Sequence, residues 1–376
     1  MDNQNIIDNF LKDWKIDSVQ NFIYALNICG CYSYCWALTG ISGNYIRRFL
    51  SKNSRRKAYK SFKIPKKSGG FRSISSPVND LKDIQRAINA LLLSIFEPSP
   101  YAMGFCRNRG VDTNAKIHIG QTCIFNTDLE NFFPSITKQM VRKALHRELG
   151  DVISSNEAIN YICSLCTVPN DEGIEVLPQG SPASPVLSNI VLKALDRKLA
   201  LYAELWECRY TRYADDITFS HNSTVRKFSQ FKQLRIRSII EEFGLKINEK
   251  KTKVLVQGER LEVTGVTVSS NKANVARKYI KQLRTLMHLW DKYGYEQAQH
   301  IYVRDFCGGI EKSLTSVING KINYLCMIKG KQDSTYRRFK SRYETAEKKR
   351  KALSKTKVVL YRRSRNWNKK SSPAHL

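Results

Sequence analysis

Two adjacent aspartates, Asp215 and Asp216, stand between strand-like residues in the segment RYADDITFS. Carboxylates this close at a hairpin bend repel one another, and bound divalent cations offset that cost. A surface turn is the plainer alternative, because Asp favours turns. A third carboxylate, Asp128, ends the hydrophobic segment CIFNTD and favours a metal site. Three acidic ligands from two strands could hold a pair of Mg²⁺ ions about 3.5–4 Å apart, the arrangement that supports in-line phosphoryl transfer.

A run rich in Gly, Ser and Pro, LPQGSPASP over residues 177–185, lies between these carboxylates in the sequence. It opens a helix that we expect to begin near Val186. Such a run offers backbone N–H groups and allows close approach to a ligand. By itself it would be only a rigid loop with a helix cap. Together with the carboxylates it indicates the wall of a nucleotide-binding site.

These motifs need a scaffold in which helices alternate with short strands. Apolar residues recur at helical spacing over residues 81–95 and 187–199. Strand-like runs cover residues 123–128, 209–220 and 263–268. This order favours an antiparallel sheet backed by helices over repeated parallel units.

The charge of the chain indicates the class of its partner. The 376 residues include 63 Lys and Arg against 33 Asp and Glu, a formal net charge of +30. That excess points to nucleic acid, and 42% hydrophobic residues exclude a disordered basic protein. Residues 331–376 hold 16 Lys and Arg against three acidic residues, so this extension is either an RNA-contacting element or a solvated arm.

Cysteine use and hydropathy indicate a reduced, cytoplasmic protein. The ten cysteines are irregularly placed, and the CxxC of Cys163 and Cys166 has no second ligand pair for zinc, so we expect core thiols. No charged residue occurs from Ser18 to Ile46, but polar residues interrupt this stretch. We therefore expect a buried helical layer there and no membrane span. We also expect no secretory signal.

The order of the motifs resembles that of reverse transcriptases. FNTDLENFFPSI, PQGSPASPVLSNI, RYADDITFS and GLKINEKKTK are similar to their successive palm motifs, and IPKKSGGFRSISSP is similar to their fingers segment. The segments NAKIH, from Asn114, and VTG, from Val263, match the NAxxH and VTG elements of bacterial retron reverse transcriptases. The resemblance extends from about Ile64 to about Val268. The segment YAMGFCRNRGVDT keeps the Gly104-Phe105 core of the family and varies around it.

The resemblance implies roles for individual residues. It makes Asp128, Asp215 and Asp216 the ligands of two Mg²⁺ ions and Phe133 an aromatic gate against the sugar of the nucleotide. It implies nucleotide contacts for Lys66, Arg72, Gln179, Gly180 and Lys251, with Lys67 competing for the role of Lys66. It implies RNA contacts for Asn114, His118, Val263, Thr264 and Gly265.

Each of these roles has a plainer alternative. The basic residues could be solvated charges, and Phe133 could be an ordinary core residue. His118 could be a hydrogen-bonded core histidine, an alternative that we favour because only a motif supports an RNA contact. Thr264 and Gly265 could serve a strand bend.

The fold that the resemblance implies is an α+β right-hand polymerase. It has an N-terminal helical region, fingers with part of the palm, a palm built on an antiparallel sheet, a helical thumb and a basic C-terminal extension. The expected bounds of these five parts are 1–60, 61–127, 128–268, 269–330 and 331–376.

The function that the resemblance implies is RNA-directed DNA synthesis from deoxynucleoside triphosphates. Retron enzymes bind a cognate structured noncoding RNA, start from the 2′-hydroxyl of an internal guanosine and make a branched RNA–DNA molecule, msDNA. They commonly act in antiphage defence with an effector protein. A group II intron type of reverse transcriptase is one alternative, and a nucleic-acid scaffold that restrains an effector is another.

Overall fold

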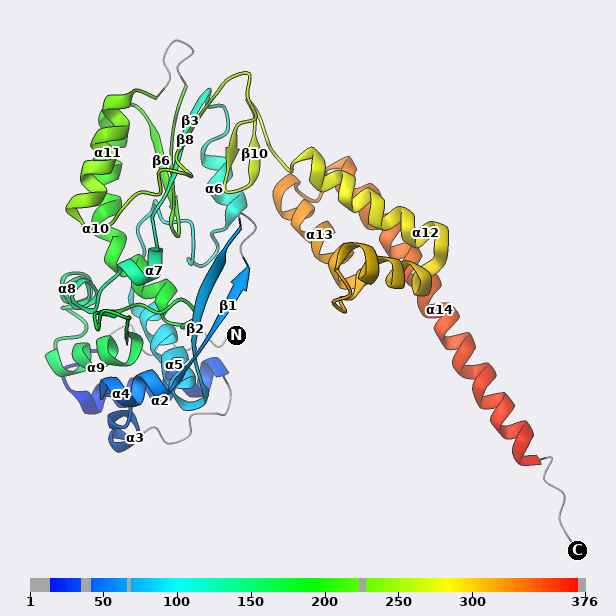
Figure 1. Ribbon diagram of the computed structural model, residues 1–376, viewed down its shortest axis with the longest axis horizontal. Helices are drawn as coiled ribbons and strands as arrows, with labels where there is room; N and C mark the ends of the chain where they lie inside the picture. The colour runs from blue at the N-terminus through cyan, green and yellow to red at the C-terminus, as the bar shows by residue number, and fades with distance from the viewer. Residues whose placement is uncertain (1–13, 35–41, 66–68, 223–227, 371–376) are drawn as a thin grey trace, which may run out of the picture. The chain divides into compact units, whose positions relative to one another are not determined.

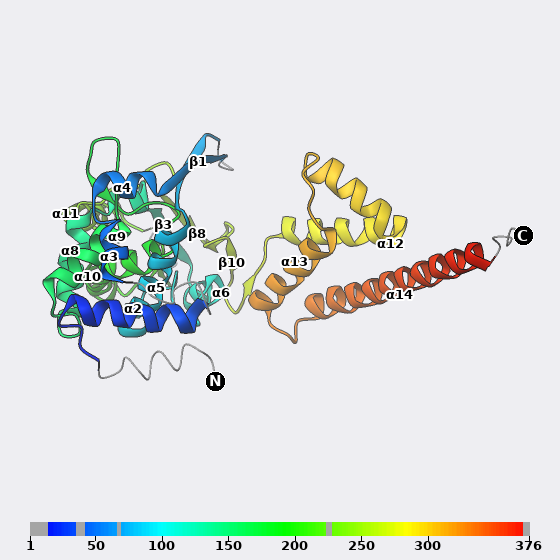
Figure 2. The same ribbon diagram turned by 90° about the horizontal axis from the view of Figure 1, so that it is seen from below.

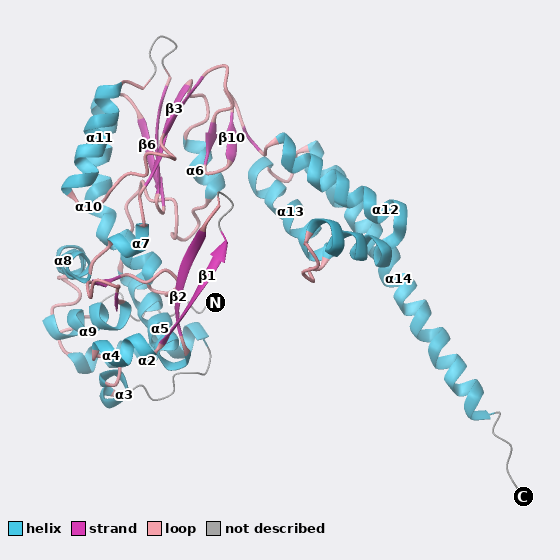
Figure 3. Ribbon diagram, in the orientation of Figure 1, coloured by secondary structure: helices cyan, strands magenta, loops and turns pink. Residues whose placement is uncertain are grey.

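The computed structural model describes residues 14–34, 42–65, 69–222 and 228–370. The chain divides into two compact units, residues 1–264 and 265–376, which we describe separately. Helices and strands alternate through the first unit, whereas the second is mostly helical (Figures 1 and 3). Within the described ranges, no helix is both long and apolar enough to cross a membrane.

A four-stranded sheet, in the order β6-β7-β3-β8, lies at the centre of the first unit. All its pairings are antiparallel, as the order of elements led us to expect. Because successive side chains of a strand point to opposite faces, the sheet can be covered on both sides. The strands are β3 (Cys123–Asp128), β6 (Arg209–Tyr213), β7 (Asp216–His221) and β8 (Lys253–Val256).

Helices α10 (Ser184–Leu205) and α11 (Gln230–Glu242) lie on one side of this sheet, and α6 (Val111–Ile117) lies on the other (Figure 1). The α10 side is aromatic: the rings of Phe125 and Phe228 stack with centroids 4.9 Å apart, and Phe219 packs beside them. Large rings on one face, with their apolar area removed from water, fix that face toward the helices.

The chain before the sheet forms a helical layer. Helix α2 (Val19–Tyr34) packs along α5 (Asn79–Ile95), as Figure 2 shows, and buries Phe22 and Leu26 completely. Of the stretch without charges, residues 19–34 thus form the expected helix, and residues 35–41 lie outside the described residues. The other helices of this region are α3 (Gly43–Arg47), α4 (Lys52–Lys57), α8 (Lys138–Leu149) and α9 (Asn156–Cys166). Cys163 and Cys166 are both buried in α9, as expected for core thiols.

Smaller elements extend from this body. The hairpin of β1 and β2 is paired over its full length and is largely exposed. The short helix α7 follows β3 closely. These elements are β1 (Tyr59–Pro65), β2 (Phe71–Pro77), α7 (Phe132–Ser135), β4 (Val168–Pro169), β5 (Glu175–Val176) and β9 (Glu262–Val263).

In the second unit, a short strand pair precedes three mutually packed helices. Helix α13 buries five apolar residues at helical spacing, from Leu314 to Ile328, and α14 adds the buried ring of Phe339. The basic segment therefore begins inside the helical unit. Helix α12 is interrupted at Gly294, whose φ of 72° is left-handed. The elements are β10 (Val266–Val268), β11 (Ala273–Asn274), α12 (Arg277–Phe306), α13 (Leu314–Lys329) and α14 (Ser334–Lys370).

Candidate active site

The three aspartates lie at one end of the central sheet. Asp128 is the last residue of β3 and is the register partner of Asp216, the first residue of β7. Directly opposed residues of an antiparallel pair point to the same face, so these two carboxylates share one face of the sheet. Asp215 lies in the tight turn between β6 and β7, and its carbonyl accepts a hydrogen bond from the Leu129 N–H at 2.9 Å. The fold thus gathers carboxylates from two distant segments.

The electrostatics of this cluster are unfavourable without a cation. Burial, together with the charges of Asp128 and Asp215, raises the pKa of Asp216 to about 7. Burial also raises the pKa of Asp215, and the charge of Asp128 adds to that effect. Carboxylates that disfavour one another's ionisation in this way are stabilised when a divalent cation neutralises them.

The three carboxylates are suitable ligands for a hard divalent cation, although they do not converge on a single point. Across the described residues, no three Asp, Glu, His or Cys side chains are gathered closely enough to hold an ion. Asp128 Oδ2 instead lies 2.6 Å from Lys251 Nζ. Oxygen ligands suit Mg²⁺ and Mn²⁺, and Mg²⁺ needs few of them from the protein, so three carboxylates suffice as the protein's share. A cation would compete with Lys251 for Asp128.

Two of the predicted basic residues lie near the carboxylates. The hydrogen bond to Asp128 raises the pKa of Lys251, and Asp215 adds to the effect. Arg72, exposed on β2, lies close enough for its charge to act on Asp215, where it lowers a pKa that burial raises. Lys66 and Lys67 lie outside the described residues.

The two adjacent phenylalanines after β3 differ in exposure. Phe132 is buried in the core, whereas Phe133 is half-buried at its edge. Both belong to the helical turn α7, and their different exposure distinguishes them. The ring of Phe133 also contacts Phe105, at 6.2 Å between centroids. Part of the Phe133 side chain is therefore exposed to solvent, whereas Phe132 is buried.

The Gly/Ser/Pro loop is joined to the β1–β2 hairpin. The Ser75 N–H donates to the Gln179 carbonyl at 2.8 Å. A Cβ on Gly180 would lie 2.8 Å from the Ser75 carbonyl oxygen, and the φ of 134° at Gly180 also favours glycine. We predicted that the backbone of this loop would approach a ligand closely. At Gly180 it instead approaches the backbone of β2 closely. Gly180 is exposed and Gln179 is half-buried, so both keep surface for a ligand.

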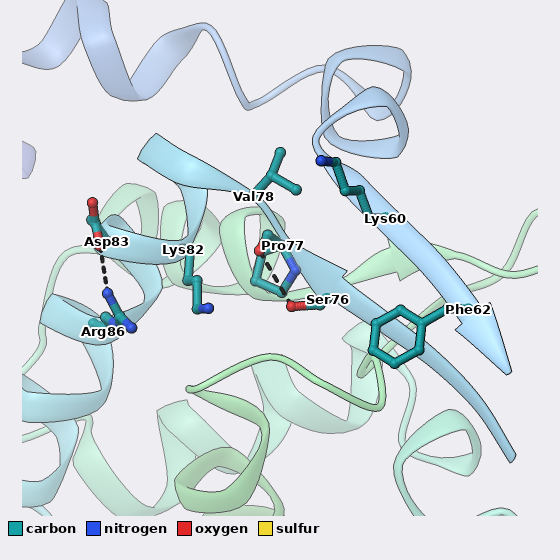
Figure 4. Close-up of a pocket in the computed structure, with 8 residues that line it drawn as sticks. All are labelled: Lys60, Phe62, Ser76, Pro77, Val78, Lys82, Asp83 and Arg86. Carbon is teal, nitrogen blue, oxygen red and sulfur yellow. Dashed lines mark hydrogen bonds and ion pairs between the residues drawn. The ribbon is translucent and has the colours of Figure 1, made fainter. Parts of the chain in front are cut away.

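A basic hollow of about 460 Å³ lies where β1 and β2 meet α5 (Figure 4). Lys60, Lys82 and Arg86 line it, and the exposed ring of Phe62 stands at its edge. Arg86 pairs with Asp83 at 2.9 Å. A concave surface that combines cations with an accessible aromatic ring suits single-stranded nucleic acid.

The predicted RNA-contacting residues are mostly interior. Both ring nitrogens of His118 are hydrogen bonded, to Ser220 at 2.6 Å and to Thr211 at 2.7 Å, and burial lowers its pKa to about 3. His118 has the environment of the neutral core histidine that we favoured, and it offers no surface to RNA. Asn114 and Val263 are also fully buried, so direct RNA contact by these three side chains does not fit the structure.

The remaining two residues of that group form a turn beside Asn114. Asn114 Nδ2 donates to Thr264 Oγ1 at 3.3 Å, which joins the NAxxH and VTG elements. Thr264 and Gly265 both have left-handed φ values, of 47° and 82°. The bend that we considered for them is therefore present, and they retain some exposed surface.

Several buried polar residues that form hydrogen-bond networks were not predicted from the sequence. Gln85 links three segments: it donates to Tyr59 and to the Leu165 carbonyl and accepts from Ser181, all at 2.7 Å. Asn189, Asp196 and Arg212 form a second network beside the turn between β6 and β7. The periodicity of the sequence could not identify them, because Asp196 directly follows Leu195 and is turned away from the apolar stripe of the expected helix.

Comparison with known proteins agrees with the geometry. The reverse transcriptase (RNA-dependent DNA polymerase) family matches residues 64–268. The chain therefore belongs to the reverse transcriptase family and is an RNA-directed DNA polymerase, an enzyme that copies an RNA template from nucleotides and depends on a divalent metal ion.

Its relatives specify the type. The chain is 35% identical over 289 residues to the Retron Mx65 reverse transcriptase of Myxococcus xanthus, covering 74% of this chain and 67% of that one. It is 34% identical over 233 residues to the Retron Ec86 reverse transcriptase of Escherichia coli, covering 61% and 69%. The protein is thus a retron reverse transcriptase. Among solved structures, telomerase from Candida albicans aligns with a TM-score of 0.43 and 13% identity, over 77% of this chain and 56% of that one.

Proposed function

We propose that this enzyme synthesises DNA with two Mg²⁺ ions held by Asp128, Asp215 and Asp216. The observation that carries the proposal is the in-register pairing of Asp128 with Asp216 beside the turn that holds Asp215. We assign the parts of a right-hand polymerase accordingly. The assignments are an N-terminal helical region over 1–60, fingers with part of the palm over 61–127, palm over 128–268, thumb over 269–330 and basic extension over 331–376.

Bound Mg²⁺ would activate the primer hydroxyl and stabilise the leaving pyrophosphate. The residues of the chain bind and orient the nucleotide around it. Arg72, with Lys66 beyond the described strand, neutralises the triphosphate, while Gln179 and Gly180 face its base and sugar. Lys251, whose Nζ lies 2.6 Å from Asp128, holds a proton that it can release to pyrophosphate.

The basic hollow between the hairpin and α5 is our proposed entry for the template. Lys60, Lys82 and Arg86 would pair with phosphates, and Phe62 would stack on a base. For the cognate RNA, the exposed turn of Thr264 and Gly265 offers a further contact, which the buried Asn114 holds in place.

We further propose that the template is a structured noncoding RNA, that synthesis starts from an internal guanosine 2′-hydroxyl and that the product is branched msDNA. The support is the kinship with retron reverse transcriptases and the presence of the NAxxH and VTG elements. We propose a cytoplasmic enzyme that acts with an effector protein in antiphage defence. The group II intron type is less favoured, because the same two elements argue against it.

Sequencing of the nucleic acid that copurifies with the protein tests this proposal. We expect a DNA joined to an RNA through a guanosine 2′-linkage, which debranching enzyme would release. An intron RNA would instead support the group II alternative. RNA without DNA would support a scaffold that restrains an effector. Either of those two outcomes would overturn the msDNA proposal.

Deletion of residues 331–376 is expected to weaken RNA binding and to flatten its dependence on salt. Each phosphate that the basic helix α14 neutralises contributes about −0.7 to −0.9 to the slope of log K against log salt. Binding of the cognate RNA, measured by filter binding between low and moderate salt, gives that slope. Because Phe339 packs inside the helical unit, a shorter deletion that begins after Leu353 keeps the packing and serves as the control. An unchanged slope in both variants would make the extension a passive arm.

A further inference from the structure

A fully buried arginine lies directly behind the turn that carries the catalytic aspartates. Arg212, on β6, makes a bidentate pair with Asp196 of α10, with both N–O distances at 2.7 Å. Neither side chain has any exposed surface. Asp196 also accepts a hydrogen bond from Tyr210 at 2.8 Å. Burying two charges costs desolvation energy that only excellent geometry repays, so a pair of this kind calls for a specific reason.

The free end of the same guanidinium reaches the turn. Arg212 Nη1 donates to the Ala214 carbonyl at 3.1 Å and to Asn189 Oδ1 at 3.2 Å. Asn189, two helical turns before Asp196 on α10, in turn donates to the Gly104 carbonyl at 3.0 Å. The network therefore joins α10, the 103–106 loop and the backbone of the residue that precedes Asp215.

Ala214 is the residue that needs this support. It occupies the first position of the two-residue turn between β6 and β7 with a φ of 56°, a conformation in which glycine is normally found. The loop that contains Gly104 also lies close to this turn, because a Cβ on Gly104 would lie 2.6 Å from the Ala214 nitrogen. A residue without a side chain at position 104 is thus required for the loop to lie against the turn. Strained backbone of this kind persists only where its surroundings over-determine it.

We propose that Asn189, Asp196, Arg212 and Gly104 form a brace that holds the catalytic turn and thereby positions the carboxylates of Asp215 and Asp216. The side chain of Arg212 is on the face opposite Asp216, because neighbouring strand residues alternate and the register partner of Asp216 is Tyr213. The brace acts from behind the sheet and leaves the metal side open. These are positioning residues, and the inference rests on the proposed metal site.

The test is Asn189→Ala, compared with Ser188→Ala. Both are buried positions of α10 that make side-chain hydrogen bonds, but Ser188 donates only to Pro185, in the first turn of its own helix, at 2.7 Å. In Asn189→Ala we expect kcat to fall by about ten- to a hundredfold, since small displacements of reacting groups have effects of that size. We also expect the Mg²⁺ concentration for half-maximal rate to rise, with the KM for deoxynucleotide and the Kd for RNA unchanged. Ser188→Ala is expected to match the wild type in all four.

A second variant perturbs the same turn through the 103–106 loop. Gly104→Ala, whose new methyl group would press on the Ala214 backbone, is expected to raise the Mg²⁺ requirement in the same way. If both variants fold with wild-type thermal stability and show an unchanged Mg²⁺ requirement and kcat, the brace has no positioning role. The metal-site proposal fails separately, if the paired Asp215→Asn and Asp216→Asn variant still extends a primer.

Discussion

Replacing Asp215 and Asp216 together by Asn is expected to abolish metal-dependent DNA synthesis while RNA binding stays intact. The substitution keeps the size and hydrogen-bonding capacity of the side chains but removes two of the three negative charges that would hold the cations. Extension of a DNA primer on a homopolymer RNA, at several concentrations of Mg²⁺ and Mn²⁺, measures the loss. Extension at the wild-type rate would refute the assignment of the metal ligands.

The metal-free protein offers a separate readout of the same cluster. The folded-state pKa of Asp216, about 7, lies above the value of about 3.9 for an unfolded aspartate. Between these two values the folded state binds more protons than the unfolded state, so this group lowers the free energy of unfolding as pH rises toward 7. Thermal unfolding in chelator at pH 5 and pH 8 should therefore show a smaller loss of stability in the double Asn variant than in the wild type.

Two results of that unfolding experiment would contradict the expectation. Equal losses in the two proteins would mean that neither burial nor the neighbouring carboxylates raise the pKa of Asp216 in the folded state. A greater loss in the variant would mean that their charges are stabilising as they stand, with Lys251 as the dominant partner. Added Mg²⁺ should raise the unfolding temperature of the wild type more than that of the variant.

The carboxylate cluster could be predicted from the sequence because its parts are local. Asp128 ends an apolar strand and Asp216 begins one, so antiparallel pairing of the two strands is enough to bring them together. Strands β3, β6 and β7 and helices α5 and α10 were predicted for the same reason, since each has its own hydrophobic period, whereas β8 and the β1–β2 hairpin were not predicted. Exact bounds, such as the start of α10 at Ser184, depend on the cap and shifted by two residues from the expected Val186.

What the sequence could not supply is the partner of each buried polar group. The NAxxH motif is compatible both with an RNA contact by His118 and with a core histidine. Only the tertiary contacts with Ser220 and Thr211 show that both ring nitrogens are hydrogen bonded inside the protein. Likewise, nothing in the sequence distinguishes Arg212 among the 63 Lys and Arg residues of the chain. Its pairing with Asp196 depends on how α10 crosses the sheet, which no local pattern specifies.

Phe133→Ala is expected to raise the incorporation of ribonucleotides relative to deoxynucleotides by tens of fold. A polymerase that makes DNA must reject substrates that differ by one hydroxyl, and a rigid ring beside the sugar makes that hydroxyl clash. Phenylalanine also offers the displaced oxygen no hydrogen-bond partner, so the oxygen is left unsatisfied. Each factor of ten in selectivity corresponds to about 1.4 kcal/mol. Single-nucleotide extension with each substrate measures the ratio of kcat/KM values.

Phe132→Ala is the matched control, because the two rings are neighbours with centroids 4.9 Å apart but differ in burial. Removing the buried Phe132 ring leaves a cavity and should lower stability by about 3–5 kcal/mol, with the sugar selectivity of the remaining folded enzyme unchanged. Phe133→Ala should show the reverse: a small change in stability and a large change in selectivity. If Phe133→Ala folds, remains active and keeps the wild-type ratio, Phe133 is not the gate, and a changed ratio in Phe132→Ala would transfer the role to its neighbour. Because Phe133 is half-buried and Phe132 is buried, we expect the change in selectivity in Phe133→Ala and not in Phe132→Ala.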